Sequence, residues 1–194
     1  MALPNRTGTR PGCSSCLQQA GGCRIDRINA YERRIEPCVD CGYCTSRAGC
    51  PRNGDGYGAL LDRLQNADML VVATPVYFAS VPAPLKAVFD RAQQLFFKST
   101  PSQKYKNFAK HGVVITSCGA DNTKMADCVA EQCRWFFSCL QTGVSTQIHM
   151  RGSDKTPLSG QDSSDIALLS RKIFAEQPHN GVPQSASAAR ETDS

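Results

Sequence analysis

The residues with the most distinctive chemistry are four cysteines in one short run, with two, two and five residues between them: Cys38, Cys41, Cys44 and Cys50. A run this compact can enclose one cubane cluster, because each thiolate reaches a different iron while the backbone turns around the cluster. Gly42 and Gly49 supply the backbone freedom that such a turn requires. The first three cysteines have the spacing of bacterial ferredoxins, and the fourth precedes a proline. We therefore predict a [4Fe–4S] cluster; a zinc site and a loop without metal are the alternatives.

A second candidate site follows the apolar run 69–73 and consists of five consecutive residues: Thr74, Pro75, Val76, Tyr77 and Phe78. A Thr-Pro turn at the end of a strand exposes backbone N–H and C=O groups, and the two aromatic side chains offer flat apolar surface. Both features suit a flat heteroaromatic ligand. The alternative is an ordinary strand-to-helix turn in which Tyr77 only packs. A weaker signal of the same kind follows the run 112–116, where small residues permit close approach of a ligand: Ser117, Cys118 and Gly119.

Hydroxyl and amide side chains near the N-terminus form a third candidate site, suited to a phosphate group: Asn5, Thr7 and Thr9. Arg10-Pro11 follows them and can open a short helix. Free N–H groups at a helix N-terminus favour a bound phosphate. The alternative is a disordered terminus.

The elements that must position these residues alternate along the chain. Apolar runs bounded by turn residues predict four strands, of which the first is weak and the last peripheral: 23–28, 69–73, 112–116 and 144–150. Apolar residues at helical spacing predict four helices: 57–65, 82–97, 122–140 and 163–176. Continuous apolar strands are typical of parallel sheets covered on both faces, and the alternation with helices predicts a doubly wound α/β sheet. Such sheets bind ligands at the carboxyl ends of their strands.

Composition narrows the class of protein. The 194 residues suit one domain, which we expect over 1–177, followed by a disordered Pro-, Ser-, Ala- and Gly-rich tail over 178–194. The net charge of +5 is mild and the basic residues are scattered, so nucleic-acid binding is not expected. No apolar run approaches the ~20 residues that cross a bilayer, so a membrane partner is not expected either. The 11 cysteines are typical of metal or redox chemistry in a reducing compartment, and we expect a cytoplasmic protein.

Together these segments resemble the iron–sulfur flavoproteins and, more broadly, the NAD(P)H-dependent FMN reductases of the flavodoxin superfamily. The resemblance is closest over 36–91. There the cysteine run is followed by Asn66-Ala-Asp68, the buried strand, the turn 74–80 and Leu85-Lys-Ala-Val-Phe-Asp-Arg91. Past Arg91 the resemblance is one of architecture.

The resemblance implies a flavodoxin-like three-layer sandwich with helices on both faces of a parallel sheet. It implies FMN across the strand ends, with 74–78 against the isoalloxazine ring, 117–119 as another wall, and Thr7 and Thr9 at the end of the phosphate loop. The implied function is an FMN-dependent oxidoreductase or electron-transfer flavoprotein, in which a flavin that exchanges one or two electrons works with a one-electron cluster. The implied partners are NAD(P)H or a ferredoxin, and the implied assembly is a homodimer or homotetramer.

Two other functions stay open. One is an NAD(P)H-dependent FMN or quinone reductase without a cluster, and the other is a non-enzymatic metal-binding module. The cysteine spacing favours the cluster-containing flavoprotein over the first, and the Thr-Pro-Val-Tyr turn favours both flavoproteins over the second. No Gly-x-Gly-x-x-Gly follows a predicted strand, so a nicotinamide site is not identified.

The N-terminus departs from the family pattern. The family begins with a buried strand before the Asn/Thr part of its phosphate loop, whereas only Met1-Ala-Leu-Pro4 precedes Asn5 here. That strand is central in the flavodoxin order 2-1-3-4-5. We therefore expect this chain to be N-terminally incomplete and to lack the first strand.

Overall fold

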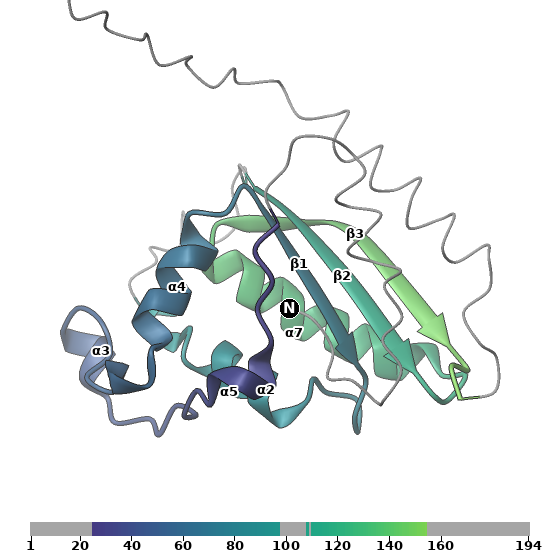
Figure 1. The fold of residues 1–194 in the computed structure, drawn as a ribbon, viewed down its shortest axis with the longest axis horizontal. Coiled ribbons are helices and arrows are strands. Elements are labelled where there is room, and N and C mark those ends of the chain that lie inside the picture. Colours follow the sequence, from purple (N-terminus) through teal and green to yellow (C-terminus); the bar gives the residue numbers. More distant parts are fainter. Residues whose placement is uncertain (1–24, 98–107, 109, 155–194) are drawn as a thin grey trace, which may run out of the picture.

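The strands form a parallel sheet, as predicted. The computed structural model describes residues 25–97, 108 and 110–154. Within these ranges the sheet has three strands in the order β1-β2-β3 (Figure 1): β1 at Met69–Pro75, β2 at Lys110–Cys118 and β3 at Thr142–Arg151. The strand predictions at 69–73, 112–116 and 144–150 are confirmed, and each strand extends slightly beyond its prediction.

The burial of each strand follows its place in the sheet. Leu70, Val72 and Thr74 of β1 are buried, and the positions that alternate with them are half-buried. The central strand β2 is buried at every position over 113–116, as its continuous apolar run predicts. β3 alternates between partly covered and exposed positions, and among the described strands it pairs with β2 alone, which agrees with its predicted peripheral place.

The described helices and 3-10 turn precede β1 or lie between the strands, in chain order: α2 at Ala30–Arg33, α3 at Tyr43–Ser46, η1 at Asn53–Asp55, α4 at Tyr57–Gln65, α5 at Ala83–Asp90, α6 at Gln93–Phe96 and α7 at Thr123–Cys139. α4 has the predicted bounds. α7 begins one residue after the predicted start, because Asn122 is its N-cap and accepts a bond from the Lys124 N–H.

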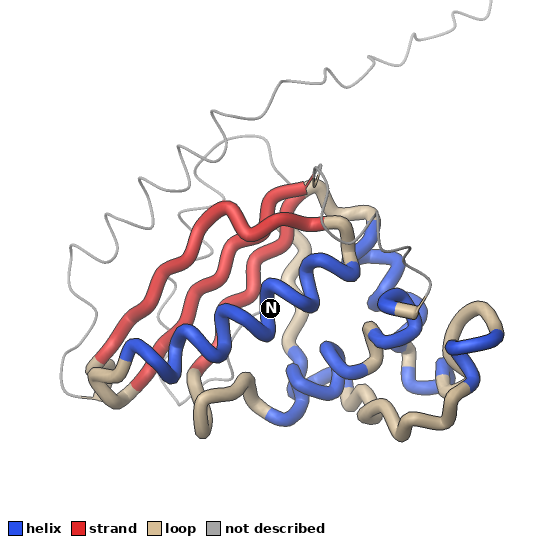
Figure 2. Tube along the Cα trace, turned by 180° about the vertical axis from the view of Figure 1, so that it is seen from behind, coloured by secondary structure: helices blue, strands red, loops and turns tan. Residues whose placement is uncertain are grey.

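The main core lies between the sheet and the helices. α7 crosses one face of the sheet in the foreground of Figure 2. The rings of Phe89 in α5 and Phe136 in α7 stack with centroids 4.1 Å apart, which joins the two helices. Val72 and Val114 of the sheet belong to the same buried cluster. The predicted helix 163–176 and the predicted tail 178–194 lie outside the described residues.

Two predictions about elements are wrong in part. The weak strand at 23–28 is absent over its described part, 25–28. No ladder of hydrogen bonds joins this segment to a described strand; the Arg63–Asp26 ion pair and burial of Ile28 hold it instead. The predicted single helix 82–97 is instead two helices, α5 and α6. The α-helical bonding pattern is interrupted at Arg91 and Ala92, where the Ala92 N–H donates to the Phe89 carbonyl, three residues back.

Candidate functional site

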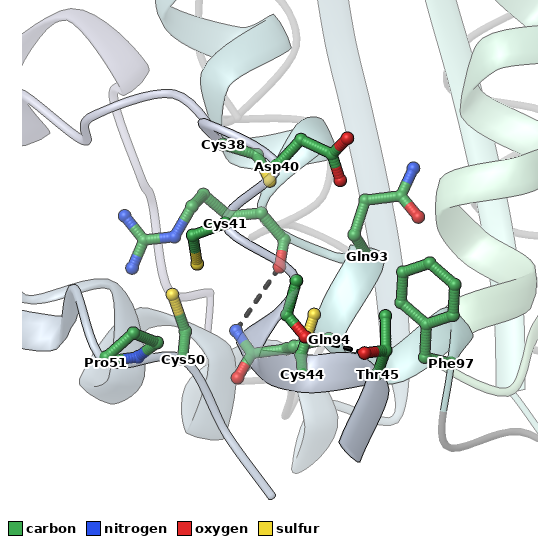
Figure 3. A pocket seen from close by; sticks show the side chains of 12 residues that line it. Cys38, Asp40, Cys41, Cys44, Thr45, Cys50, Pro51, Gln93, Gln94 and Phe97 are labelled. Atoms are coloured by element: carbon green, nitrogen blue, oxygen red, sulfur yellow. Dashed lines mark hydrogen bonds between the residues drawn. The ribbon is translucent and has the colours of Figure 1, made fainter. Parts of the chain in front are cut away.

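The four predicted cluster cysteines line one pocket. Cys38 and Cys41 lie in the loop before α3, Cys44 lies in α3, and Cys50 follows it. The opposite wall comes from the junction of α5 and α6 and includes Arg91. Figure 3 shows the cysteine side chains around this pocket, with those of Cys41 and Cys50 pointing toward one another. All four cysteines thus line one pocket, and their role as ligands of a single cluster stays a prediction.

Two glycines let the cysteine loop turn. Gly42 has φ 69° and precedes α3, and Gly49 has φ 82° just before the last cysteine. Both values lie in the left-handed region, which costs glycine little. The Thr45 hydroxyl donates to the Gly42 carbonyl at 2.6 Å and fixes the first turn of α3. The backbone freedom predicted for these glycines is thus used.

The cysteine thiols are close enough to influence one another. Burial raises the pKa of the Cys44 thiol, a backbone N–H bond partly opposes this, and charge on Cys38, Cys41 and Cys50 raises the pKa again. Thiolates are the ligand form of cysteine, so a positive metal centre would relieve this repulsion. Over 25–97, 108 and 110–154, no group of three His, Cys, Asp or Glu side chains is gathered as closely as a single metal ion requires.

A buried arginine ties both flanks of the cysteine loop to the helical core. One terminal nitrogen of Arg91 donates to the Glu36 carbonyl at 3.2 Å and to Asp55 Oδ2 at 2.8 Å. The other donates to the Arg52 carbonyl at 2.7 Å and to Asn53 Oδ1 at 3.3 Å. Glu36 precedes the first cysteine and Arg52 follows the last, and these two side chains also form an ion pair. Arg91 therefore fixes the loop at its entrance and at its exit.

Asp55 completes this clamp. Its carboxylate accepts backbone N–H bonds from Glu36 and Tyr57, both at 3.0 Å, besides the Arg91 bond. Burial raises the pKa of the Asp55 carboxyl, but the two N–H donors and the Arg91 charge outweigh it and hold the pKa below its usual value. The Arg91 guanidinium also lies over the Tyr57 ring, 4.7 Å from its centroid.

Sequence reasoning missed Asp55 and assigned no role to Arg91. A signal was present for the arginine: it follows Val88 by three positions and therefore lies on the apolar face of its helix, where an unpaired charge is costly. No comparable pattern marks Asp55, whose partner lies 36 residues away.

The two predicted strand-end segments lie side by side. Pro75 is opposite Ser117 in the β1–β2 register, and the Val76 N–H donates to the Ser117 carbonyl at 2.9 Å. This confirms that 74–78 and 117–119 share one sheet edge. The side chains of Thr74, Val76 and Cys118 are buried, so these residues offer mainly backbone groups to a ligand.

The aromatic pair of this segment lies on a tight, exposed turn. The backbones of Tyr77 and Ser80 bond each other at 2.9 and 3.0 Å, and the two residues between them, Phe78 and Ala79, have φ of 50° and 58°. Such values are strained for residues with a Cβ and are frequent at ligand sites. Phe78 is fully exposed. Gln132 of α7 braces the turn by accepting from the Ser80 hydroxyl and donating to the Ala79 carbonyl.

Gly119 lies close to the exposed side chain of Asp154. A Cβ built there would lie 2.1 Å from Asp154 Oδ2. The small residue predicted to admit a ligand thus admits the Asp154 carboxylate, at the edge shared with Ser117. The predicted phosphate residues Asn5, Thr7 and Thr9 lie outside the described residues. In the part of the chain that the structure covers, no helix is long and apolar enough to cross a membrane.

Known proteins with similar sequences or similar folds were found for this chain. The NADPH-dependent FMN reductase family matches residues 13–152. An iron–sulfur flavoprotein of Methanosarcina thermophila is 32% identical over 104 residues, which cover 52% of this chain and 50% of that protein. An NAD(P)H:quinone oxidoreductase from Methanothermobacter marburgensis aligns with a TM-score of 0.57 at 17% identity, over 93% of this chain and 95% of that one. An FMN-dependent NADH-azoreductase from Bacillus anthracis, solved with FMN, aligns with a TM-score of 0.57 at 13% identity, over 84% and 87%.

These similarities differ in what they establish. The chain spans half or less of the length of the curated relatives it matches. The likeness to the two solved structures shows a flavodoxin-like fold. The family match, in contrast, covers most of the chain and includes both the cysteine loop and the strand ends. The chain belongs to the family of NADPH-dependent FMN reductases.

Proposed function

We propose that this chain is an FMN-dependent oxidoreductase in which a [4Fe–4S] cluster, held by the four cysteines, exchanges electrons with FMN at the strand ends. The observation that carries the proposal is the single pocket lined by Cys38, Cys41, Cys44 and Cys50 on a scaffold of the FMN reductase family. When bound, FMN supplies one- and two-electron chemistry and the cluster supplies one-electron chemistry.

The donor set of the pocket fits a cubane cluster better than a single ion. A zinc ion requires its ligands to converge on one point, and no such group is found among residues 25–97, 108 and 110–154. A cubane places each thiolate on its own iron, so four cysteines spaced around a pocket are the arrangement it requires. Arg91, which lines this pocket, has a buried Nε–H without a partner among the described residues, and such a donor is suited to a sulfur acceptor.

The strand ends support the flavin part of the proposal. Exposed aromatic surface on Tyr77 and Phe78 lies at the edge that Ser117 and Gly119 share. We assign the isoalloxazine contact to 74–78, a second wall to 117–119, and the phosphate to Asn5, Thr7 and Thr9. The pyridine nucleotide named in the family description is the proposed electron donor, and a ferredoxin-like acidic carrier is a proposed partner for this basic chain.

The relative placement of the two sites favours a homodimer or homotetramer. In Figure 1, α3, which carries part of the cysteine pocket, lies at one end of the described fold, to the side of the sheet and away from the carboxyl end of β1. Electrons pass efficiently only over short distances, so the cluster of one subunit would serve best beside the flavin of another.

One anaerobic purification tests the proposal. The full chain should contain FMN and about four irons with matching sulfide per chain, as in one cubane. Cys41→Ser should lose iron and keep FMN, whereas Cys128→Ser, which changes an exposed cysteine on α7, should keep both. FMN without iron would instead indicate an NAD(P)H-dependent FMN or quinone reductase without a cluster. Zinc without FMN would indicate a metal-binding module.

A further inference from the structure

One nitrogen of Arg91 stands apart from the others. The two terminal nitrogens donate to Glu36, Asp55, Arg52 and Asn53. Nε is buried and has no acceptor in the described part of the chain. The side chain is 1% exposed, so bulk water does not solvate this N–H. Burying a donor without an acceptor costs free energy, so this N–H requires a partner that the described residues do not supply.

The surroundings of Arg91 indicate the chemistry of that partner. The residue lines the same pocket as the four cysteines. Bonds from both terminal nitrogens fix the guanidinium plane, so Nε cannot turn away to find another acceptor. The acceptors that a loaded cysteine pocket would provide are cysteine thiolates and bridging sulfides.

We propose that the Nε–H of Arg91 donates a hydrogen bond to a sulfur atom of the cluster and thereby raises the cluster's reduction potential. This inference rests on the proposed cluster. The reduced cluster carries one more negative charge than the oxidised one, and its sulfurs hold part of that charge. A fixed donor therefore stabilises the reduced form more than the oxidised form. Because an arginine does not lose its proton in proteins, the effect does not depend on pH in the physiological range.

Substitution by lysine removes the Nε donor while keeping a positive charge. Arg91→Lys keeps a cation beside Asp55 but removes Nε. Arg134→Lys is the matched control, because Arg134 is an exposed residue of α7 that pairs with Glu131. In a redox titration with dithionite as reductant, followed by electron paramagnetic resonance, Arg91→Lys should lower the ratio of reduced to oxidised cluster about tenfold at fixed potential. For a one-electron couple this is a shift of about −59 mV. Arg134→Lys should leave the potential unchanged.

A measurement on the unmodified chain covers the case in which Arg91→Lys does not fold. The chain is produced with arginine labelled with ¹⁵N at Nε, and the reduced cluster is examined by pulsed electron paramagnetic resonance. A ¹⁵N coupling that is absent from the unlabelled protein supports the hydrogen bond.

The outcomes separate this inference from the proposed function. If the wild-type chain holds no iron and sulfide, the proposed function is overturned and this inference with it. If the cluster is present but no ¹⁵N coupling is found, the cluster stands and the Arg91 assignment is wrong. An unchanged potential in a folded, loaded Arg91→Lys variant overturns the assignment in the same way.

Discussion

Replacing Asp55 with asparagine should show how much the clamp around the cysteine loop contributes to stability. The substitution keeps the size of the side chain and one acceptor oxygen but removes the charge facing Arg91. The side chains of Arg91 and Asp55 are 1% and 10% exposed, so the arginine would be left as a buried cation without its counter-ion. Removing one partner of a buried ion pair costs about 3–5 kcal/mol. Because Arg91 keeps its bonds to Glu36, Arg52 and Asn53, we expect the lower end, about 3 kcal/mol.

An exposed ion pair provides the control. Asp90 pairs with Lys86 four residues away in α5, and their side chains are 36% and 44% exposed. Asp90→Asn should therefore cost no more than about 0.5 kcal/mol. Urea unfolding of iron-free protein, followed by circular dichroism, gives the free energy of unfolding of each variant. The same Asp55→Asn change in an Arg91→Met background should cost less than about 1 kcal/mol, since no buried cation remains.

Two results would refute this reasoning. One is an Asp55→Asn variant no less stable than Asp90→Asn. The other is a cost of Asp55→Asn that stays the same when Arg91 is already methionine, because the carboxylate would then act through something other than the arginine.

Three further predictions follow from other contacts. Because its pKa is lowered in the folded state, the ionised Asp55 stabilises the fold above the unfolded pKa of about 4. The stability difference between wild type and Asp55→Asn should therefore shrink as the pH of the urea titration falls below that value, and a pH-independent difference would contradict the assignment. Phe78→Ala should weaken FMN binding by about 1–3 kcal/mol in fluorescence titrations while leaving the unfolding midpoint unchanged, since the side chain is fully exposed; unaltered affinity would remove Phe78 from the flavin site. Gly112→Ala should destabilise the chain by roughly 1–3 kcal/mol in urea, because a Cβ there would lie 2.7 Å from the buried Phe137 ring, and a neutral result would mean that this ring can move.

Local patterns in the sequence account for most of the observed elements. Leu60, Leu61 and Leu64 share one helical face and predict α4 to its terminal residues. The apolar run of β2 predicts a strand buried on both faces. The break between α5 and α6 could not be predicted from a local pattern. It lies at Arg91, whose side chain donates hydrogen bonds to residues up to 55 positions away in sequence.

In the candidate site, too, features encoded by local sequence were predictable, and features that depend on distant contacts were not. The compact spacing of the cysteines predicts that they lie close together, whereas the opposite wall of their pocket and the anchoring by Arg91 come from residues distant in sequence. The adjacency of 74–78 and 117–119 follows from parallel strands, whose carboxyl ends meet at one edge. The brace from Gln132 and the clamp from Asp55 depend on tertiary contacts across 53 and 36 residues, and no local pattern marks either of them.

The contacts of Arg91 close the segment between Glu36 and Arg52, sixteen positions apart, into a ring without a covalent bond. The entropy cost of closing a flexible ring grows slowly with its length, by only about 0.6 kcal/mol for each doubling. Residues added between Cys44 and Cys50 would therefore enlarge the ring at small cost while its base stayed anchored in the core. This makes the segment a suitable place to graft foreign metal-binding loops: the scaffold supplies closure, and the insert need encode only its ligands.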